Sequence, residues 1–320
     1  MLAELLLTHT YYLSRVTPTM RSTAPNRPFP VSAADYPFED HWFAYRDGWI
    51  HYVDEGRGVP VLLLHGNPTW SFLYREVIKA LGTECRLISP DYPGFGFSTP
   101  PSDFRFTPRE QARAIATLIE HLGLGDFVLV VQDWGGPIGL SYAIDRPRNI
   151  RGIVVMNSWA WRPSVPQTLF SWVMGGWPLG YWLQTRRNFF ARRIVPRGIW
   201  QEQKRTPDIL DAYVKPFPTP AARYPTWVFP RHIRKSRHWL NQIESRLSRL
   251  SSLPAQILWG RHDEPGFRPV EMRRWQRHLP LHETEVLEDA SHFVQEDRPE
   301  RLVAAIRRIL ERTRTPGEAK

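Results

Sequence analysis

Three short segments of this 320-residue chain contain side chains that could do chemistry together. The first is QDWGG at positions 132–136, which follows an apolar run and precedes a helical pattern. Asp133 would lie in the turn between strand and helix, with small residues two and three positions later, as in a nucleophile elbow. A carboxylate at a helix N-terminus is stabilised as the anion and needs no base to activate it. Asp133 could equally be a plain N-cap, so this segment alone leaves both interpretations open.

The second segment is HGNPTW at positions 65–70, directly after the apolar run 61–64. A loop at this place supplies one backbone N–H of an oxyanion hole through Asn67, and Trp134 supplies the other. The amide of Asn67 and the indole of Trp134 are also side-chain donors, which would suit a departing anion. Alternatively, Asn67 is a turn residue before a helix start. We interpret His65 as a structural histidine rather than a base.

The third segment is DASHF at positions 289–293, which places His292 before the last helical pattern. The chain order nucleophile, acid, histidine requires a carboxylate between Asp133 and His292 at a strand end. The segment NSW at 157–159 has no carboxylate, whereas GRHDE at 260–264 has Asp263, with Glu264 as the less favoured neighbour. Asp263 would hold the tautomer of His292 and stabilise its imidazolium form.

The elements that must position these residues alternate along the chain. A hairpin is predicted over residues 41–55, with its turn at Asp47-Gly48. Strands are predicted at 59–65, 86–90, 127–132, 152–157, 256–259 and 283–287, and helices near 71–81, 108–122, 137–145 and 299–312. Continuous apolar strands separated by amphipathic helices predict a mostly parallel, doubly wound α/β sheet covered on both faces. Such sheets bind ligands at the carboxyl ends of their strands.

The alternation stops between residues 161 and 250, which hold seven of the 14 Trp, many Pro and helical pieces without strong strands. We interpret this stretch as a helical cap inserted over the strand ends. The predicted organisation is therefore a loosely ordered N-terminal arm (1–34), a first core part (35–160), the cap (161–250) and a second core part (251–320).

Several kinds of site are not expected. The segment GFGFS at 94–98 does not open a helix after a first strand, so we predict no NAD and no other cofactor. The segment RHD at 261–263 lacks metal-ligand spacing, and the single Cys85 excludes a disulfide framework or a multi-cysteine metal site. No apolar run approaches the roughly 18 residues of a membrane span. We expect a cytoplasmic protein.

The segments HGNPTWSFLYR (65–75), QDWGG (132–136) and SHFVQED (291–297) resemble the haloalkane dehalogenases of the α/β-hydrolase superfamily. The resemblance runs from about residue 35 to about residue 310. The segment NSWAW (157–161) and the later acid look like the subgroup with an Asp-His-Asp triad and an Asn-Trp halide pair. The resemblance implies Asp133 as nucleophile, His292 as base and Asp263 as orienting acid, with Asn67 and Trp134 holding the halide.

The resemblance also implies a reaction and partners. Asp133 would displace halide from a haloalkane, and His292 would activate water to hydrolyse the alkyl ester, releasing alcohol, halide and a proton. Self-association into a homo-oligomer is a further implication. The nearest rival function is that of an epoxide hydrolase, which needs acidic hydroxyls in the cap; Tyr181, Tyr213 and Tyr224 could supply them, but Asn67 favours the dehalogenase. The motifs also leave open a luciferase-like oxygenase and a non-catalytic ligand-binding protein.

The chain has 42 Lys and Arg against 32 Asp and Glu, a formal net charge of +10. Residues 161–250 hold 16 Lys and Arg and 4 Asp and Glu, a net of +12, while the rest of the chain carries −2. The excess therefore belongs to the cap, and no nucleic-acid-binding fold accompanies it, so we expect no nucleic-acid partner. We interpret the charge as a solvated arginine-rich surface; a second interpretation is that it attracts anions or an acidic partner.

Overall fold

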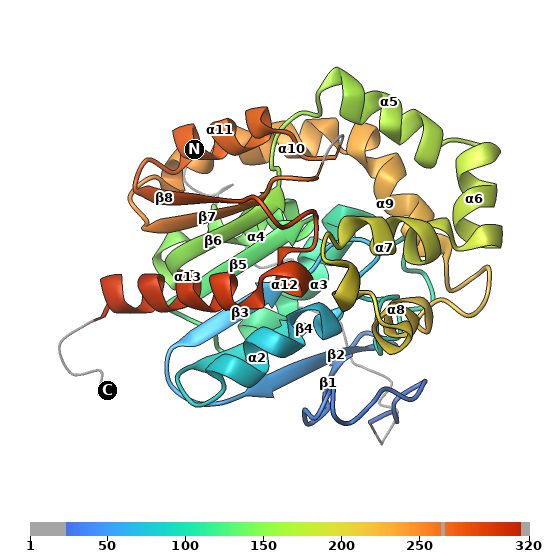
Figure 1. Cartoon of the computed structure of the whole chain (residues 1–320), viewed down its shortest axis with the longest axis horizontal. Helices are drawn as coiled ribbons and strands as arrows, with labels where there is room; N and C mark the ends of the chain where they lie inside the picture. The colour runs from blue at the N-terminus through green and yellow to red at the C-terminus, as the bar shows by residue number, and fades with distance from the viewer. Residues whose placement is uncertain (1–23, 264–265, 315–320) are drawn as a thin grey trace, which may run out of the picture.

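The computed structural model describes residues 24–263 and 266–314, and its strands form one eight-stranded sheet (Figure 1). The order of strands across the sheet is β1-β2-β4-β3-β5-β6-β7-β8. The strands are β1 (His41–Tyr45), β2 (Gly48–Glu55), β3 (Pro60–Leu64), β4 (Arg86–Pro90), β5 (Phe127–Asp133), β6 (Ile150–Ser158), β7 (Ala255–Gly260) and β8 (His282–Leu287).

The pairing of these strands confirms the predicted α/β-hydrolase type of sheet. β1 and β2 form the predicted antiparallel hairpin, and β2 also pairs antiparallel with β4. All pairs from β4 through β3, β5, β6 and β7 to β8 are parallel. The carboxyl ends of β3, β5, β6, β7 and β8 therefore meet at one edge, where a doubly wound sheet binds its ligands.

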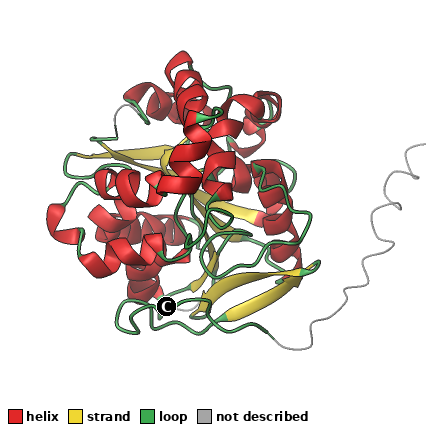
Figure 2. Cartoon of the chain, turned by 90° about the vertical axis from the view of Figure 1, so that its right-hand side faces the viewer, coloured by secondary structure: helices red, strands yellow, loops and turns green. Residues whose placement is uncertain are grey.

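Helices cover both faces of the sheet, as Figure 2 shows. Alternate residues of the central strands belong to two separate apolar cores, with Leu62 and Leu129 in one and Val61 and Val128 in the other. This period of two explains why strands buried on both faces read as continuous apolar runs. The covering helices are α2 (Arg75–Leu81), α3 (Pro108–His121), α4 (Gly135–Ala143), α11 (Pro269–His278), α12 (Val294–Asp297) and α13 (Pro299–Arg312).

Between β6 and β7 the described chain is helical, as the break in the sequence pattern predicts. Its α-helices are α5 (Val165–Met174), α6 (Leu179–Arg187), α7 (Val195–Gly198), α8 (Pro207–Val214), α9 (Tyr224–Lys235) and α10 (Arg237–Glu244). The short segments of the chain are the 3-10 turns η1 (Ser71–Tyr74), η2 (Pro147–Asn149), η4 (Glu202–Lys204) and η5 (Leu247–Leu250), and the π segment η3 (Phe190–Ile194). The domain boundaries at residues 161 and 250 stay a prediction.

Helix α11, which connects the parallel strands β7 and β8, was not predicted from the sequence. Its face toward the protein buries only Glu271 and Trp275, and its other positions include Arg273, Arg274 and Arg277, so its apolar period is weak. Two parallel strands need a long crossover connection, usually a helix, so the two predicted strands at 256–259 and 283–287 were a better indication of α11 than its apolar period. The first helical turn of α4 also begins at Gly135, two residues before the predicted start.

The N-terminal arm predicted for residues 1–34 lies largely outside the described residues. Its described part, residues 24–34, has no helix or strand but contacts the core. Arg27 forms an ion pair with Asp40 at 2.7 Å, and the ring of Phe29 meets Trp70 edge to face with centroids 5.7 Å apart. These contacts attach this part of the arm to the sheet.

Two further observations concern the described residues. No helix among them is long and apolar enough to cross a membrane. No group of three or more His, Cys, Asp or Glu side chains within residues 24–263 and 266–314 is arranged to hold a metal ion.

Candidate active site

Asp133 occupies a strained turn between the end of β5 and the start of α4. Its φ of 49° lies in the left-handed region, which a side chain other than glycine rarely adopts. Two glycines make room for it. A Cβ on Gly66 would lie 2.4 Å from Oδ1 of Asp133, and one on Gly135 would lie 2.3 Å from the carbonyl oxygen of Leu64. The elbow interpretation of this segment fits this geometry better than a plain N-cap, which has no need for a positive φ.

Two backbone N–H groups face the carboxylate of Asp133. The N–H of Asn67 donates to Oδ1 at 2.9 Å, and the N–H of Trp134 also donates to this side chain. Burial nevertheless raises the pKa of Asp133 above its ordinary value, against the opposing effects of His292 and of both N–H groups. In the balance that sets this pKa, loss of water on burial therefore outweighs the two backbone donors and the charge of His292.

His292 lies between Asp133 and Asp263, on the loop after β8. Its Nδ1 is 2.7 Å from Oδ2 of Asp263, and its Nε2 is 4.0 Å from Oδ2 of Asp133. Burial lowers the pKa of His292, but the charges of Asp263 and Asp133 outweigh it, so the pKa is raised above the ordinary value. The three predicted residues are thus brought together from three distant parts of the chain.

Asn157, at the end of β6, holds the acid of this arrangement in place. Its Nδ2 donates to Oδ2 of Asp263 at 2.9 Å and to the carbonyl oxygen of Gly260 at 3.2 Å. Its Oδ1 accepts from the N–H of Gly260 at 2.8 Å. The strand end that lacks a carboxylate therefore contributes an amide that orients Asp263. Glu264, the less favoured acid, lies outside the described residues.

Gln132, like Asn157, has a role in the site that was not predicted from the sequence. Its Nε2 lies 2.8 Å from Nε2 of His292 and donates to the carbonyl oxygen of the same residue at 3.2 Å. Because an amide nitrogen can only donate, Nε2 of His292 accepts and its Nδ1 carries the proton toward Asp263. Gln132 therefore favours the tautomer that a general base requires. Its position next to Asp133 was the available signal.

Aromatic rings surround the open side of the triad. Trp134 meets Trp159 with centroids 4.6 Å apart and Phe229 of α9 with centroids 5.5 Å apart. Phe267 lies parallel to the ring of His292, with centroids 5.5 Å apart. These contacts give the carboxylate of Asp133 apolar surroundings, which weaken competition from bulk water.

His65 is a structural histidine, as predicted. It is fully buried, its Nδ1 lies 2.8 Å from the carbonyl oxygen of Gly66, and its Nε2 accepts from the N–H of Tyr92 at 3.1 Å. Burial lowers its pKa to about 4. His65 therefore joins the loop that carries Asn67 to the loop after β4. The segment 94–98 is a loop, as expected.

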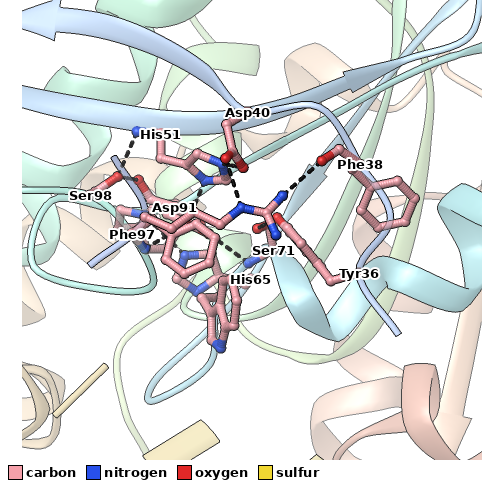
Figure 3. Close-up of polar contacts among 12 residues, drawn as sticks. Tyr36, Phe38, Asp40, His51, His65, Ser71, Asp91, Phe97 and Ser98 are labelled. Carbon is pink, nitrogen blue, oxygen red and sulfur yellow. Dashed lines mark hydrogen bonds and ion pairs between the residues drawn. The ribbon is translucent and has the colours of Figure 1, made fainter. Parts of the chain in front are cut away.

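A second histidine, His51 of β2, also lies between two aspartates (Figure 3). Its Nδ1 is 2.8 Å from Oδ2 of Asp91, and its Nε2 is 3.1 Å from Oδ1 of Asp40. Asp91 accepts further bonds from the backbone N–H groups of Ser71 at 2.7 Å and Phe97 at 2.9 Å. Burial acts to lower the pKa of His51, but the two carboxylates outweigh it and raise the pKa.

The sequence of this chain is similar to known α/β-hydrolases. A family model described as the alpha/beta hydrolase fold matches residues 59–299. Haloalkane dehalogenase 2 of Mycobacterium tuberculosis is 41% identical over 274 residues, which cover 85% of this chain and 94% of the relative. A cis-3-alkyl-4-alkyloxetan-2-one decarboxylase of Shewanella oneidensis is 30% identical over 289 residues, with 87% and 90% covered.

Among solved structures, the haloalkane dehalogenase DatA of Agrobacterium tumefaciens is similar, with a TM-score of 0.78 and 26% identity. The match covers 88% of this chain and 100% of DatA. The residues matched by the family model include strands β3 to β8 and the helical segment between β6 and β7. This chain therefore belongs to the haloalkane dehalogenase family of the α/β-hydrolase superfamily.

Proposed function

We propose that this protein hydrolyses haloalkanes to an alcohol, a halide ion and a proton through an alkyl ester on Asp133. The observation that carries this proposal is the arrangement at Asp133: Oδ1 accepts from the backbone N–H of Asn67, and Oδ2 faces Nε2 of His292 at 4.0 Å. The 41% identity to a haloalkane dehalogenase supports the same reaction class.

The first step uses the two oxygens of Asp133 differently. Oδ1 accepts from the N–H of Asn67, which leaves Oδ2 as the oxygen able to attack carbon. As the new C–O bond forms, the carbon–halogen bond breaks and its electron pair leaves with the halide. The amide of Asn67 and the indole N–H of Trp134 stabilise the negative charge that develops on the halogen.

The second step uses His292 as a general base. The separation of 4.0 Å between its Nε2 and Oδ2 of Asp133 places the histidine beside the ester without a direct hydrogen bond. Water gives its proton to Nε2 and attacks the ester carbonyl carbon, while the N–H groups of Asn67 and Trp134 stabilise the oxyanion. Asp263 stabilises the imidazolium, which gives its proton to the leaving oxygen as the acyl C–O bond breaks and the alcohol departs. The carboxyl group of Asp133 then loses its proton to water, which restores the carboxylate.

Contacts of the candidate acidic hydroxyls disfavour an epoxide hydrolase. The hydroxyl of Tyr213 donates to Glu296, which also binds Arg75 through two bonds. The rings of Tyr181 and Tyr224 pack on Trp227 instead of on the triad. Within the described chain, none of these three hydroxyls is hydrogen-bonded to Asp133 or His292.

Bromide release from 1,2-dibromoethane and 1-bromobutane tests the proposal. Wild-type protein should release bromide, and Asp133→Ala should not, whereas Arg57→Gln at an exposed turn serves as a matched control and should retain activity. The same preparation is offered styrene oxide, to detect a diol, and a cis-3,4-dialkyloxetan-2-one, to detect carbon dioxide. Absence of bromide across a broad haloalkane panel, with either of those products formed or with none at all, would overturn the dehalogenase assignment.

A further inference from the structure

Helix α5 turns its apolar residues toward solvent. Val165 is 83% exposed and Leu169 is 63% exposed, and with Trp172 they follow the spacing of one helix face. The side chain that α5 buries fully is Ser171, whose hydroxyl donates to the carbonyl oxygen of Pro230 in α9 at 2.6 Å. The usual orientation of an amphipathic surface helix is therefore reversed: the exposed face of α5 is apolar, and the side chain that it buries against α9 is polar.

The exposed apolar surface continues into α6. Trp177, between the two helices, is 72% exposed, and Leu179 and Trp182 of α6 are exposed as well. Figure 1 shows α5 and α6 at the outer edge of the molecule, away from the sheet. We define the cap patch as Val165, Leu169, Trp172, Val173, Trp177, Leu179 and Trp182. Contiguous apolar surface of this kind marks an interaction site.

The chain around the cap patch carries cations and no carboxylates. Residues 146–201 contain nine arginines and no Asp or Glu, and residues 212–243 contain six Lys or Arg and no Asp or Glu. Two of these arginines lie over tryptophans of the cap patch. The guanidinium of Arg234 is 3.8 Å from the ring centroid of Trp172, and that of Arg187 is 5.2 Å from that of Trp182.

Four of the positive charges near the patch have no carboxylate partner among the described residues. In the described part of the molecule, Arg187, Arg231, Arg234 and Lys235 enter no ion pair with a carboxylate. Burial and the charges of Arg231 and Arg234 lower the pKa of Lys235, so this group of cations repels itself. Anions from outside the chain would relieve that repulsion.

We propose that the cap patch binds the surface of a lipid bilayer that contains anionic lipids. Tryptophan and leucine side chains enter the boundary between headgroups and acyl chains, where indole rings are favoured. The arginines stacked beside them extend to the lipid phosphates. This binding is peripheral.

A second copy of the chain fits the cap patch less well. A twofold contact through this surface would place the patch against itself, with arginine edges facing arginine edges and no carboxylate between them. An anionic bilayer matches both the apolar centre and the positive surroundings. The lipid is therefore the occupant that charge complementarity favours.

Cosedimentation with vesicles tests this proposal without relying on the reaction. We expect the full-length protein to bind vesicles of phosphatidylcholine with about one-third phosphatidylglycerol, and to bind pure phosphatidylcholine at least about tenfold more weakly. Leu169→Ser/Trp172→Ser/Trp177→Ser should lower the partition coefficient at least about tenfold. Arg187→Gln/Arg234→Gln should lower it about fivefold for each charge removed.

Matched control variants distinguish binding through the cap patch from non-specific binding of exposed apolar or charged side chains elsewhere on the protein. Leu281→Ser/Val286→Ser removes exposed apolar side chains at the β8 edge of the sheet, and Arg57→Gln/Arg105→Gln removes two exposed charges; both should bind vesicles like the wild type. Equal binding of the patch variants and wild type, or no preference for phosphatidylglycerol, would overturn the proposal. Sedimentation that shows a stable oligomer dissociated by the patch substitutions, without vesicle binding, would assign the patch to a second copy instead.

Discussion

Two histidines of this molecule lie between two aspartates, and only one of them is arranged for chemistry. At His51 both ring nitrogens are within hydrogen-bond distance of a carboxylate, at 2.8 Å and 3.1 Å. At His292 one nitrogen is 2.7 Å from Asp263, while the other is 4.0 Å from Asp133. The residue types and the raised pKa values are alike, so the difference lies in the second ring nitrogen, which at His292 has no carboxylate of the described residues within hydrogen-bond distance.

The carboxylates around the two histidines also differ in how many of their oxygens are hydrogen-bonded. Both oxygens of Asp91 accept backbone N–H groups, and Asp40 also binds Arg27. Oδ1 of Asp133 accepts from the N–H of Asn67, while Oδ2 faces Nε2 of His292 without a direct hydrogen bond. A fully bonded cluster stabilises one structure, whereas an incompletely bonded one can accept a substrate atom or a water. The unused bonding position at Oδ2 of Asp133 therefore separates the proposed catalytic cluster from the structural cluster at His51.

Replacing the acid of the catalytic cluster should have the largest effect. In Asp263→Asn, His292 loses the partner that holds its tautomer and stabilises its protonated form, so kcat should fall by about 10⁴-fold. Bromide release measures this, and urea unfolding should remain close to that of wild type. A variant that keeps more than about a tenth of wild-type kcat would show that Asp263 does not serve the histidine.

The pH dependence of kcat sharpens this prediction. His292 must be neutral to accept a proton, so activity falls as the pH drops below its raised pKa, above the ordinary value of about 6.5. In Asp263→Asn the acid limb should move to lower pH, because Asp263 is the stronger of the two charges that raise this pKa. An unmoved limb would assign the titration to another group.

Replacing the acid of the buried cluster should act on stability rather than on chemistry. Asp91→Asn leaves His51 without one partner in a fully buried place, so the free energy of unfolding should fall by about 3–5 kcal/mol. Urea unfolding measures the loss, and kcat per folded molecule should stay near that of wild type. A large loss of kcat in the folded fraction would remove the distinction between the two clusters.

The third effect concerns Gln132, whose amide donates to Nε2 of His292, the ring nitrogen that faces Asp133. Gln132→Met removes the donor at similar size, and we expect kcat to fall about tenfold, the equivalent of one hydrogen bond. Gln295→Met, at another buried glutamine that has no bond to the triad, is the matched control. An unchanged kcat would mean that His292 keeps its orientation through Asp263 alone.

The smallest effect should come from proton binding at His51. Its pKa is raised by folding, so its stabilising contribution is complete below the unfolded value of about 6.5. The contribution is lost as the pH rises through the folded pKa. Unfolding of wild type and His51→Gln across this range measures it: the difference between them should shrink as the pH increases. A difference that grows with pH would contradict the charged form of His51.

The sequence predicted which residues meet at His292 better than which residues meet at His51. Asp133, Asp263 and His292 stand at strand ends in a fixed order, and strand β4 lies at residues 86–90 as predicted. The partners of His51 carry no such signal, because Asp91 is 40 residues away and no pattern links them. Gln132 and Asn157 were visible in the motifs, but their roles depend on side-chain directions that spacing does not reveal.

The ester on Asp133 is the central claim, and mass spectrometry of His292→Phe tests it most directly. This variant can displace halide but lacks the base for hydrolysis, so exposure to 1-bromobutane should leave a butyl group on the peptide that contains Asp133. His292→Phe/Asp133→Ala should show no adduct on that peptide. An unmodified Asp133 in the single variant, while bromide is released, would contradict the account.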